Sequence, residues 1–292
     1  MIPNRRLPPV AGLIAGATAW GLVWYPLRLL ETAGLAGPLA ILIVFLCATL
    51  LGLPFTWRAM TEFRRGTLLF AGIGLAAGWA NLAYVLGVIH GEVVRVLLLF
   101  YLAPLWTVLL SRLLLDERLS AAGYGVIALS LAGAMIMLWH AALGIPWPKN
   151  GAEWLGLSAG LAFACSNVLS RRAQVLSIEA KSLSVWLGVL VVAMAVLMVE
   201  PPDFGSALAA LQVQWGWVGV LGIVLAAVTV AMQYGLTHTP ANRAIVILLF
   251  ELVVAAVAAW WLVDEVLTWR EWLGGAMIVA ASLLSGRMEH SR

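Results

Sequence analysis

Polar side chains recur at helical spacing inside long apolar runs of this 292-residue chain. The polar and small residues of interest are Gly78, Asn81, Tyr84, Gly160, Phe163 and Asn167. Those within one run lie three or four positions apart, so they share one face of a helix. A polar group is costly in hydrocarbon and usually faces protein or a water-filled cavity. We therefore predict that these faces converge on a binding cavity; hydrogen bonding between helices is the alternative.

Aromatic side chains within the same runs could form the walls of such a cavity. They are Trp20, Trp24, Trp79, Phe100, Tyr101 and Trp106. Aromatic walls suit apolar and aromatic solutes through stacking and area burial. The alternative is that these rings are bulk in the core or against lipid.

Two prolines and two glycines are candidate gating or hinge positions. Pro26 and Pro104 lack an N–H, so each frees the carbonyl four residues earlier. That carbonyl could accept a hydrogen bond from a solute, or the proline could be a simple kink. Gly78 and Gly160 each follow another glycine by four residues, a spacing that allows close helix packing. They could act as sliding surfaces or as plain packing contacts.

Glu251 is the acidic residue well inside an apolar run. A carboxyl at the centre of a membrane helix costs about 2.5–3.5 kcal/mol, so it needs a partner or a proton. Arg243 lies about 12 Å away along an ideal helix. Three hypotheses stay open: a proton-coupling site, a contact to the solute, or a structural pair.

Composition excludes several classes of protein. Hydrophobic residues make up 63% of the chain, charged residues 11%, and the mean hydropathy is +1.00. A soluble domain needs more polar surface. The net charge of +3 comes without a basic stripe, so no nucleic-acid partner is expected. Neither the two cysteines nor the four histidines have ligand spacing, so we expect no metal site, no cofactor and no disulfide.

Spanning a bilayer takes roughly 20 apolar residues, and the chain offers ten such runs. We predict spans at 9–30, 36–56, 67–89, 93–114, 119–140, 152–173, 182–199, 215–236, 241–263 and 270–286, with a short interfacial helix over 203–212. The first run follows Arg5 and Arg6 but is too long for a signal peptide. It is predicted to be the first transmembrane helix.

Orientation follows from the distribution of Lys and Arg between the two sides. Thirteen of the 17 lie on the side of the N-terminus. The positive-inside rule then predicts a multi-pass inner-membrane protein with both termini in the cytoplasm.

An internal repeat divides the chain near residue 146. Gly12 to Gly16 is echoed by Gly156 to Gly160, and Asp116-Glu117 by Asp264-Glu265. Five spans per half is an odd number, so the second half must enter the membrane from the opposite side. We expect an all-α polytopic membrane protein of two inverted five-helix repeats, 1–146 and 147–292, with a central site between them.

Together these features resemble the drug/metabolite transporter superfamily, in particular its EamA-type ten-helix members. The residues that carry the resemblance are Trp20-Gly21, Pro104, the run from Leu113 to Ser120, its echo from Leu262 to Thr268, and Gly274. In length and aromatic content the chain is similar to YddG-type aromatic amino acid exporters. One departure is that Glu251-Leu252 stands where many members have Glu-Pro, which puts in question the proline-dependent kink there.

The resemblance implies export of amino acids or similar metabolites through a cavity lined by the first to fourth and sixth to ninth helices. Export of drugs, nucleosides or sugar phosphates is the alternative within the superfamily. A channel or structural subunit is the alternative outside it. We expect no enzyme, because no connection could hold a soluble catalytic module. The driving ion and the oligomeric state stay open.

Overall fold

The computed structural model describes residues 8–35, 37–139, 147–264 and 266–288, which are helical with short connections. The first half holds α1 (Pro9–Thr32), α2 (Gly37–Thr56), the 3-10 helix η1 (Trp57–Arg65), α3 (Thr67–His90), α4 (Val93–Phe100), α5 (Ala103–Leu115) and α6 (Ala121–Leu138). The second half holds α7 (Gly151–Arg172), α8 (Ile178–Val199), α9 (Phe204–His238), α10 (Ala241–Leu248), α11 (Phe250–Leu262), α12 (Trp269–Leu284) and the 3-10 helix η3 (Ser285–Arg287).

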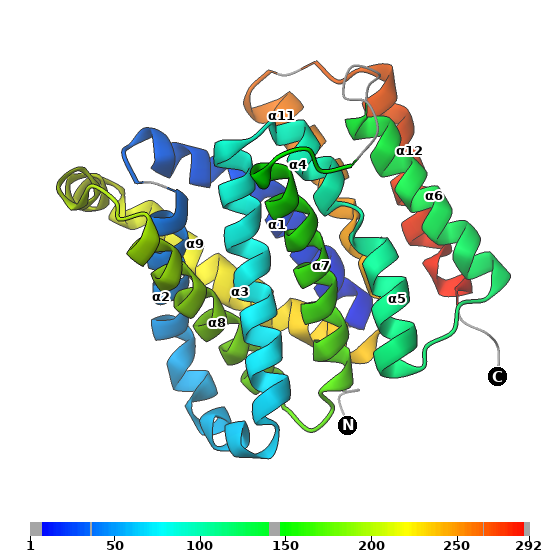
Figure 1. Cartoon of the computed structure of the whole chain (residues 1–292), viewed down its shortest axis with the longest axis horizontal. Helices are drawn as coiled ribbons and strands as arrows, with labels where there is room; N and C mark the ends of the chain where they lie inside the picture. Colours follow the sequence, from blue (N-terminus) through cyan, green and yellow to red (C-terminus); the bar gives the residue numbers. More distant parts are fainter. Residues whose placement is uncertain (1–7, 36, 140–146, 265, 289–292) are drawn as a thin grey trace, which may run out of the picture.

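Nine helical stretches among these residues are long and apolar enough to cross a membrane. Helices α4 and α5 together make one of them, and α10 and α11 make another. Helix α12, with 16 residues, extends about 24 Å and packs beside α6 (Figure 1). With α12 as the tenth crossing, the helices coincide with the predicted spans to within a few residues, except at the eighth. The predicted all-α membrane fold is confirmed.

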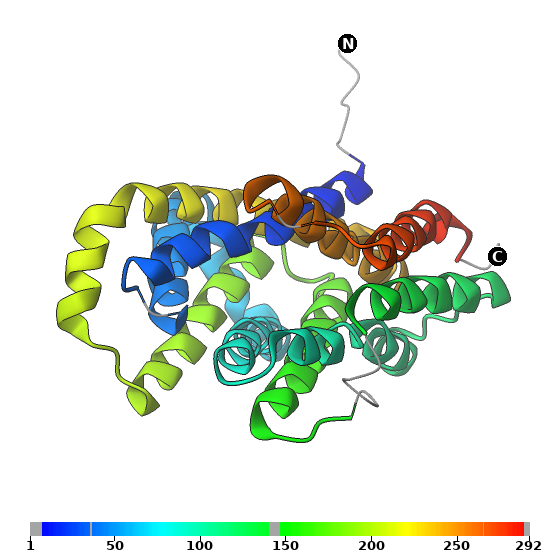
Figure 2. The same ribbon diagram turned by 90° about the horizontal axis from the view of Figure 1, so that it is seen from above.

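The separate interfacial helix predicted over residues 203–212 is wrong. Helix α9 is continuous from Phe204 to His238, and Figure 2 shows it curving around one end of the bundle before it lies beside α1. The side chain of Asp203 accepts a hydrogen bond from the backbone N–H of Gly205 and starts the helix there. No proline follows before residue 240, so nothing interrupts the backbone hydrogen bonds.

The two halves pack mainly against each other, in pairs that correspond. Helix α3 packs on α7 and α8, and its counterpart α9 packs on α1 and α2. Helix α5 packs on α7, just as α11 packs on α1, and α6 pairs with α12. Exchanging each helix with its counterpart leaves this pattern unchanged. Since each half crosses the membrane an odd number of times, the pattern is that of two inverted repeats.

The ends of α5 and α11 support the repeat at the level of single residues. Asp116 follows α5 with a φ of 56°, and Asp264 follows α11 with a φ of 54°. These are the two positive φ values of non-glycine residues in the described part of the chain. Aspartate tolerates this left-handed conformation better than most residues, because its short side chain can bond locally. An aspartate in the left-handed conformation thus follows both helices, directly after α5 and one residue later after α11.

Helices α3 and α8 join the halves by direct backbone contact. A Cβ atom on Gly78 would overlap the carbonyl of Gly188, and a Cβ on Gly188 would overlap the carbonyl of Gly74. The hydroxyl of Ser184 also donates a hydrogen bond across this contact to the carbonyl of Phe70. Small residues are what such close helix packing requires. The predicted packing role of Gly78 is therefore seen, and any sliding motion stays a prediction.

The boundary predicted after residue 146 falls beside residues 140–146, which lie outside the described residues, as do Arg5, Arg6 and Glu265. The division into 1–146 and 147–292 therefore stays a prediction in its exact position.

Candidate functional site

Two membrane spans are broken at corresponding positions. Helix α4 ends at Phe100 and α5 begins at Ala103, whereas α10 ends at Leu248 and α11 begins at Phe250. Pro104 explains the first break, because its ring clashes with the carbonyl of Phe100 and it has no N–H to donate. Broken helices inside a membrane expose backbone polar groups and are found where they line protein or a cavity.

The second break forms without a proline. The span is therefore interrupted at this position even though Leu252 stands where many family members have proline. The N–H of Leu252 bonds the carbonyl of Leu249 at 3.1 Å, an i→i−3 contact, and the N–H of Leu249 bonds Ile245 at 3.2 Å. A tightened turn at Leu249 therefore replaces the proline kink. Broken geometry is present in both repeats.

A hydrogen bond joins the two breaks. The hydroxyl of Tyr101, in the turn between α4 and α5, donates to Oε1 of Glu251, in the first turn of α11, over 2.5 Å. Among the described residues no cation lies within 4.0 Å of this carboxyl. Of the three hypotheses for Glu251, pairing with Arg243 is thus not what the structure shows. The partner is a tyrosine from the opposite repeat.

Aromatic rings surround this hydrogen bond. The ring of Phe100 lies 5.2 Å from those of Tyr84 and Tyr101 and 5.6 Å from that of Phe163, centre to centre. These distances are within the range of favourable aromatic pairs. We call Tyr84, Phe100, Tyr101, Phe163 and Glu251 the central cluster. All five were predicted as site residues, and the structure brings them together from α3, α4, α7 and α11.

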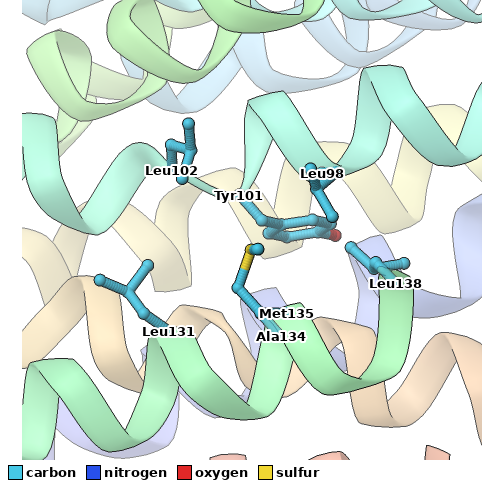
Figure 3. Close-up of a pocket in the computed structure, with 7 residues that line it drawn as sticks. All are labelled: Leu98, Tyr101, Leu102, Leu131, Ala134, Met135 and Leu138. Atoms are coloured by element: carbon cyan, nitrogen blue, oxygen red, sulfur yellow. The ribbon is translucent and has the colours of Figure 1, made fainter. Parts of the chain in front are cut away.

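Tyr101 separates two small pockets. One lies on the side of Phe163 and Glu251. The other lies between Tyr101 and the α6 residues Leu131, Ala134 and Met135, as Figure 3 shows. Each has a cavity volume of about 10 Å³, roughly the room that one water molecule needs. Ligand sites usually measure about 300–1,000 Å³, so neither pocket has room for a solute in this structure.

A glycine of the opposite repeat lies against each broken span. A Cβ on Gly160 of α7 would overlap the carbonyl of Phe100, the last residue of α4. A Cβ on Gly21 of α1 would come within 2.7 Å of the carbonyl of Glu251. The carbonyl that Pro104 frees is thus packed against Gly160. Both breaks depend on the absence of a side chain in the facing helix.

Two other predicted site residues bond locally or to a neighbour, and a third has an amide nitrogen without a partner among the described residues. Trp79 is 41% exposed and donates to the hydroxyl of Ser158 on α7 at 3.1 Å. The amide of Asn81 donates to the carbonyl of Ala77 one turn earlier in its own helix. Asn167 is buried, and its amide nitrogen has no hydrogen-bond partner in the described structure. A solute contact at these residues stays a prediction.

Among the described residues, the three remaining predicted tryptophans make none of the ring contacts of the central cluster. Trp20 packs on a core to which α1, α2, α3, α8 and α9 contribute. The indole nitrogens of Trp24 and Trp106 are buried without a hydrogen-bond partner. Pro26 lies inside α1 without ending it. Their assignments as binding and hinge residues stay predictions.

A buried ion pair, which the sequence did not predict, joins α4 and α7. The guanidinium of Arg95 on α4 donates from Nε and Nη2 to the two oxygens of Glu153 on α7, each at 2.8 Å. The side chains are 7% and 3% exposed. Glu153 lies three residues after the helix cap Asn150, a position typical of a capping residue, so the sequence suggested only a local role.

A second polar network lies at the end of the bundle that the positive-inside rule predicts to face the cytoplasm. Arg171 of α7 lies 3.6 Å from Glu117 and donates a hydrogen bond to the carbonyl of Thr237. The hydroxyl of Thr237 accepts a hydrogen bond from the buried Lys181 at 2.8 Å. Glu117 also accepts from the N–H of Ala241 at 3.0 Å. Burial raises the pKa of the Glu117 carboxyl, opposed by that N–H and by Arg171. This network joins α7, α8, α9 and the start of α10 to the connection after α5.

Inverted repeats, paired broken helices and a cluster between them together define a multi-pass membrane transporter. The chain belongs to the EamA-like transporter family, which matches residues 7–139 and again residues 150–287. The two matches correspond to the two repeats.

Relatives of this chain are transporters by name. An uncharacterized transporter of Archaeoglobus fulgidus is 29% identical over 70% of this chain and 71% of that protein. A riboflavin transporter of Rhizobium johnstonii is 29% identical over 82% of this chain and 72% of that protein. A crystal structure with 19% identity superposes with a TM-score of 0.71 over 94% of this chain and 97% of the other, a likeness of fold.

Proposed function

We propose that this protein is a secondary carrier that exports amino acids, preferentially aromatic and apolar ones, from the cytoplasm by alternating access. The observation that carries the proposal is the central cluster. Four aromatic rings contact one another beside the Glu251 carboxyl, and Phe100, Tyr101 and Phe163 line one pocket with it. Rings provide stacking for an apolar side chain, and a carboxyl without a nearby cation can receive an ammonium group.

The closed geometry supports a carrier over a channel. The pockets at the cluster are small, and the network around Arg171 joins helices at one end. The repeats are arranged so that movement of one against the other can open either end around a fixed site. The orientation we propose, with both termini in the cytoplasm, follows the positive-inside rule.

The test is counterflow in proteoliposomes. Vesicles loaded with unlabelled L-phenylalanine should take up external labelled L-phenylalanine, with saturation and with competition by L-tryptophan and L-leucine. Empty vesicles of the same lipid are the control. Uptake that does not saturate, or that ignores internal solute, would identify a channel instead.

A second candidate, transport of a riboflavin-like solute, is favoured by the relative from Rhizobium johnstonii. A flat heteroaromatic ring also suits aromatic walls, and it needs no carboxyl partner. Adding riboflavin to the panel separates the two candidates. Competition by riboflavin but not by L-tryptophan would replace amino acids as the substrate class.

A further inference from the structure

We infer that Glu251 binds a proton and the ammonium group of the solute in turn, so that the carrier exchanges one proton for each solute molecule. This inference rests on the proposed amino acid substrate. The structural basis is a buried carboxyl whose hydrogen-bond partner is the neutral hydroxyl of Tyr101. An isolated carboxylate in a low-dielectric interior is strongly disfavoured. In the closed state without solute, the carboxyl therefore needs a proton.

Among the described residues, no cation lies within 4.0 Å of the Glu251 carboxyl to take the place of that proton. The described titratable groups that face it are the hydroxyls of Tyr84 and Tyr101. The described cations of the helices around it lie near helix ends or are bonded elsewhere; they are Arg28, Arg95, Arg112, Arg171, Arg172, Arg243 and Arg270. Charge balance at this site thus depends on a mobile ion.

The exchange balances in atoms and charge. On the cytoplasmic side, an ammonium group displaces the proton from the Glu251 carboxyl, and the proton leaves to the cytoplasm. On the other side, a proton replaces the ammonium group and the solute leaves. For a zwitterionic amino acid, each cycle moves one solute outward and one positive charge inward. A proton gradient directed inward then drives export.

Tyr101 connects this exchange to the movement of the helices. Its hydroxyl comes from the break in one repeat and the carboxyl from the break in the other. When an ammonium group occupies the carboxyl, it competes with the hydroxyl for the oxygens of Glu251. Solute binding thereby loosens the contact that holds the two breaks together.

The first experiment measures accumulation under a pH gradient. Proteoliposomes with an interior at pH 6 and an exterior at pH 7, with the membrane potential clamped at zero, should concentrate L-phenylalanine up to about tenfold, since a 1:1 exchange converts one pH unit into a factor of ten. Glu251→Gln should abolish the accumulation. Glu179→Gln, the same change at an exposed position, should leave it intact.

The second experiment can be done with the wild-type protein alone, and one variant is added as a check. Adding L-phenylalanine to the weakly buffered wild-type protein in detergent should release close to one proton per bound molecule. 3-Phenylpropionate, which has the ring but no ammonium group, should release none. Glu251→Asp keeps the carboxyl and should keep the release.

The outcomes separate the two proposals. Counterflow of L-phenylalanine without accumulation or proton release overturns the exchange and leaves the carrier intact. Accumulation by Glu251→Gln equal to that of the wild type overturns the assignment to Glu251. Absence of counterflow overturns the proposed substrate and, with it, this inference.

Discussion

At the scale of single residues, the central question is how the membrane interior tolerates ionisable groups. Two solutions coexist in this chain. Arg95 and Glu153 neutralise each other through two hydrogen bonds of 2.8 Å, whereas Glu251 has a tyrosine hydroxyl at 2.5 Å. A buried ion pair is costly to break because a lone charge is left behind. A carboxyl with a neutral partner can change its proton without breaking an ion pair.

Removing the hydroxyl of Tyr101 tests its link to Glu251. We expect Tyr101→Phe to lower the free energy of unfolding by about 0.6–1.7 kcal/mol, the range for hydrogen bonds inside membrane proteins, and to slow counterflow several-fold. Thermal unfolding in detergent and counterflow measure the two effects. If the hydroxyl acts through Glu251, the double variant with Glu251→Gln will be no slower than Glu251→Gln alone. Fully additive losses would contradict that coupling.

The ion pair of Arg95 and Glu153 is expected to be structural. Glu153→Gln should lower the free energy of unfolding by about 1.5–3 kcal/mol, the range for hydrogen bonds to charged groups, because it removes the charge from the acceptor of both Arg95 hydrogen bonds. Replacing both residues, as in Arg95→Met with Glu153→Leu, should recover most of that loss. Unfolding monitored by intrinsic fluorescence provides the comparison. A double variant as unstable as the single one would show that the charge itself is required.

At the scale of elements, the broken spans depend on glycine contacts in the facing helices. Each break leaves a backbone carbonyl against a helix of the opposite repeat, and glycine makes room for it at Gly160 and at Gly21. Helices α3 and α8 use glycine in the same way. In lipid, helix association relies on close van der Waals packing, because there is no hydrophobic driving force between helices. Close backbone packing is therefore the main interaction that holds the two repeats together.

Enlarging Gly188 should separate α3 from α8. Gly188→Val places a side chain on the carbonyl of Gly74, and overpacking of this kind costs about 1–3 kcal/mol or more. We expect a lower melting temperature and a loss of monodisperse protein in size-exclusion chromatography. Gly216→Ala is the matched control, since its Cβ meets nothing within 4 Å and helix propensity favours alanine. Equal behaviour of the two variants would contradict the packing role.

At the scale of the whole molecule, the two repeats interlock rather than form separate units. Most helix pairs join one half to the other, and the pairs occur in corresponding sets. The network of Arg171, Glu117, Thr237 and Lys181 fastens one end of this arrangement. Opening that end requires α5, α7 and α9 to move apart. This movement is the testable content of alternating access.

Cross-linking the closed end should stop transport. In a background without Cys47 and Cys165, we expect Glu117→Cys with Arg171→Cys, joined through two disulfides by a short bifunctional methanethiosulfonate reagent, to lose at least tenfold in counterflow rate. Reductant should restore the rate. Each single cysteine variant, treated in the same way, controls for the reagent. Unchanged counterflow in the cross-linked protein would show that this end does not open during the cycle.

The sequence by itself determined the spans, their number and the repeat. Long apolar runs define membrane helices because backbone groups must bond internally in lipid. An odd number of spans per repeat determines the inversion. Pro104 indicated a freed carbonyl or a kink at Phe100, since proline has no N–H and its ring excludes the carbonyl four residues earlier, but the span was predicted as continuous. The aromatic and polar residues inside the spans indicated Tyr84, Phe100, Tyr101, Phe163 and Glu251 as candidate site residues; their contact with a solute stays a prediction.

Only the tertiary structure decided the partners of these residues. Tyr101 and Glu251, like Arg95 and Glu153, are far apart in sequence and meet because helices of opposite repeats pack together. Helical periodicity gives the face on which a residue lies but not the helix that the face contacts. The break at Leu249 and the continuity of α9 through residues 204–214 were also decided at this level. Both depend on how neighbouring helices satisfy the backbone, which no local pattern encodes.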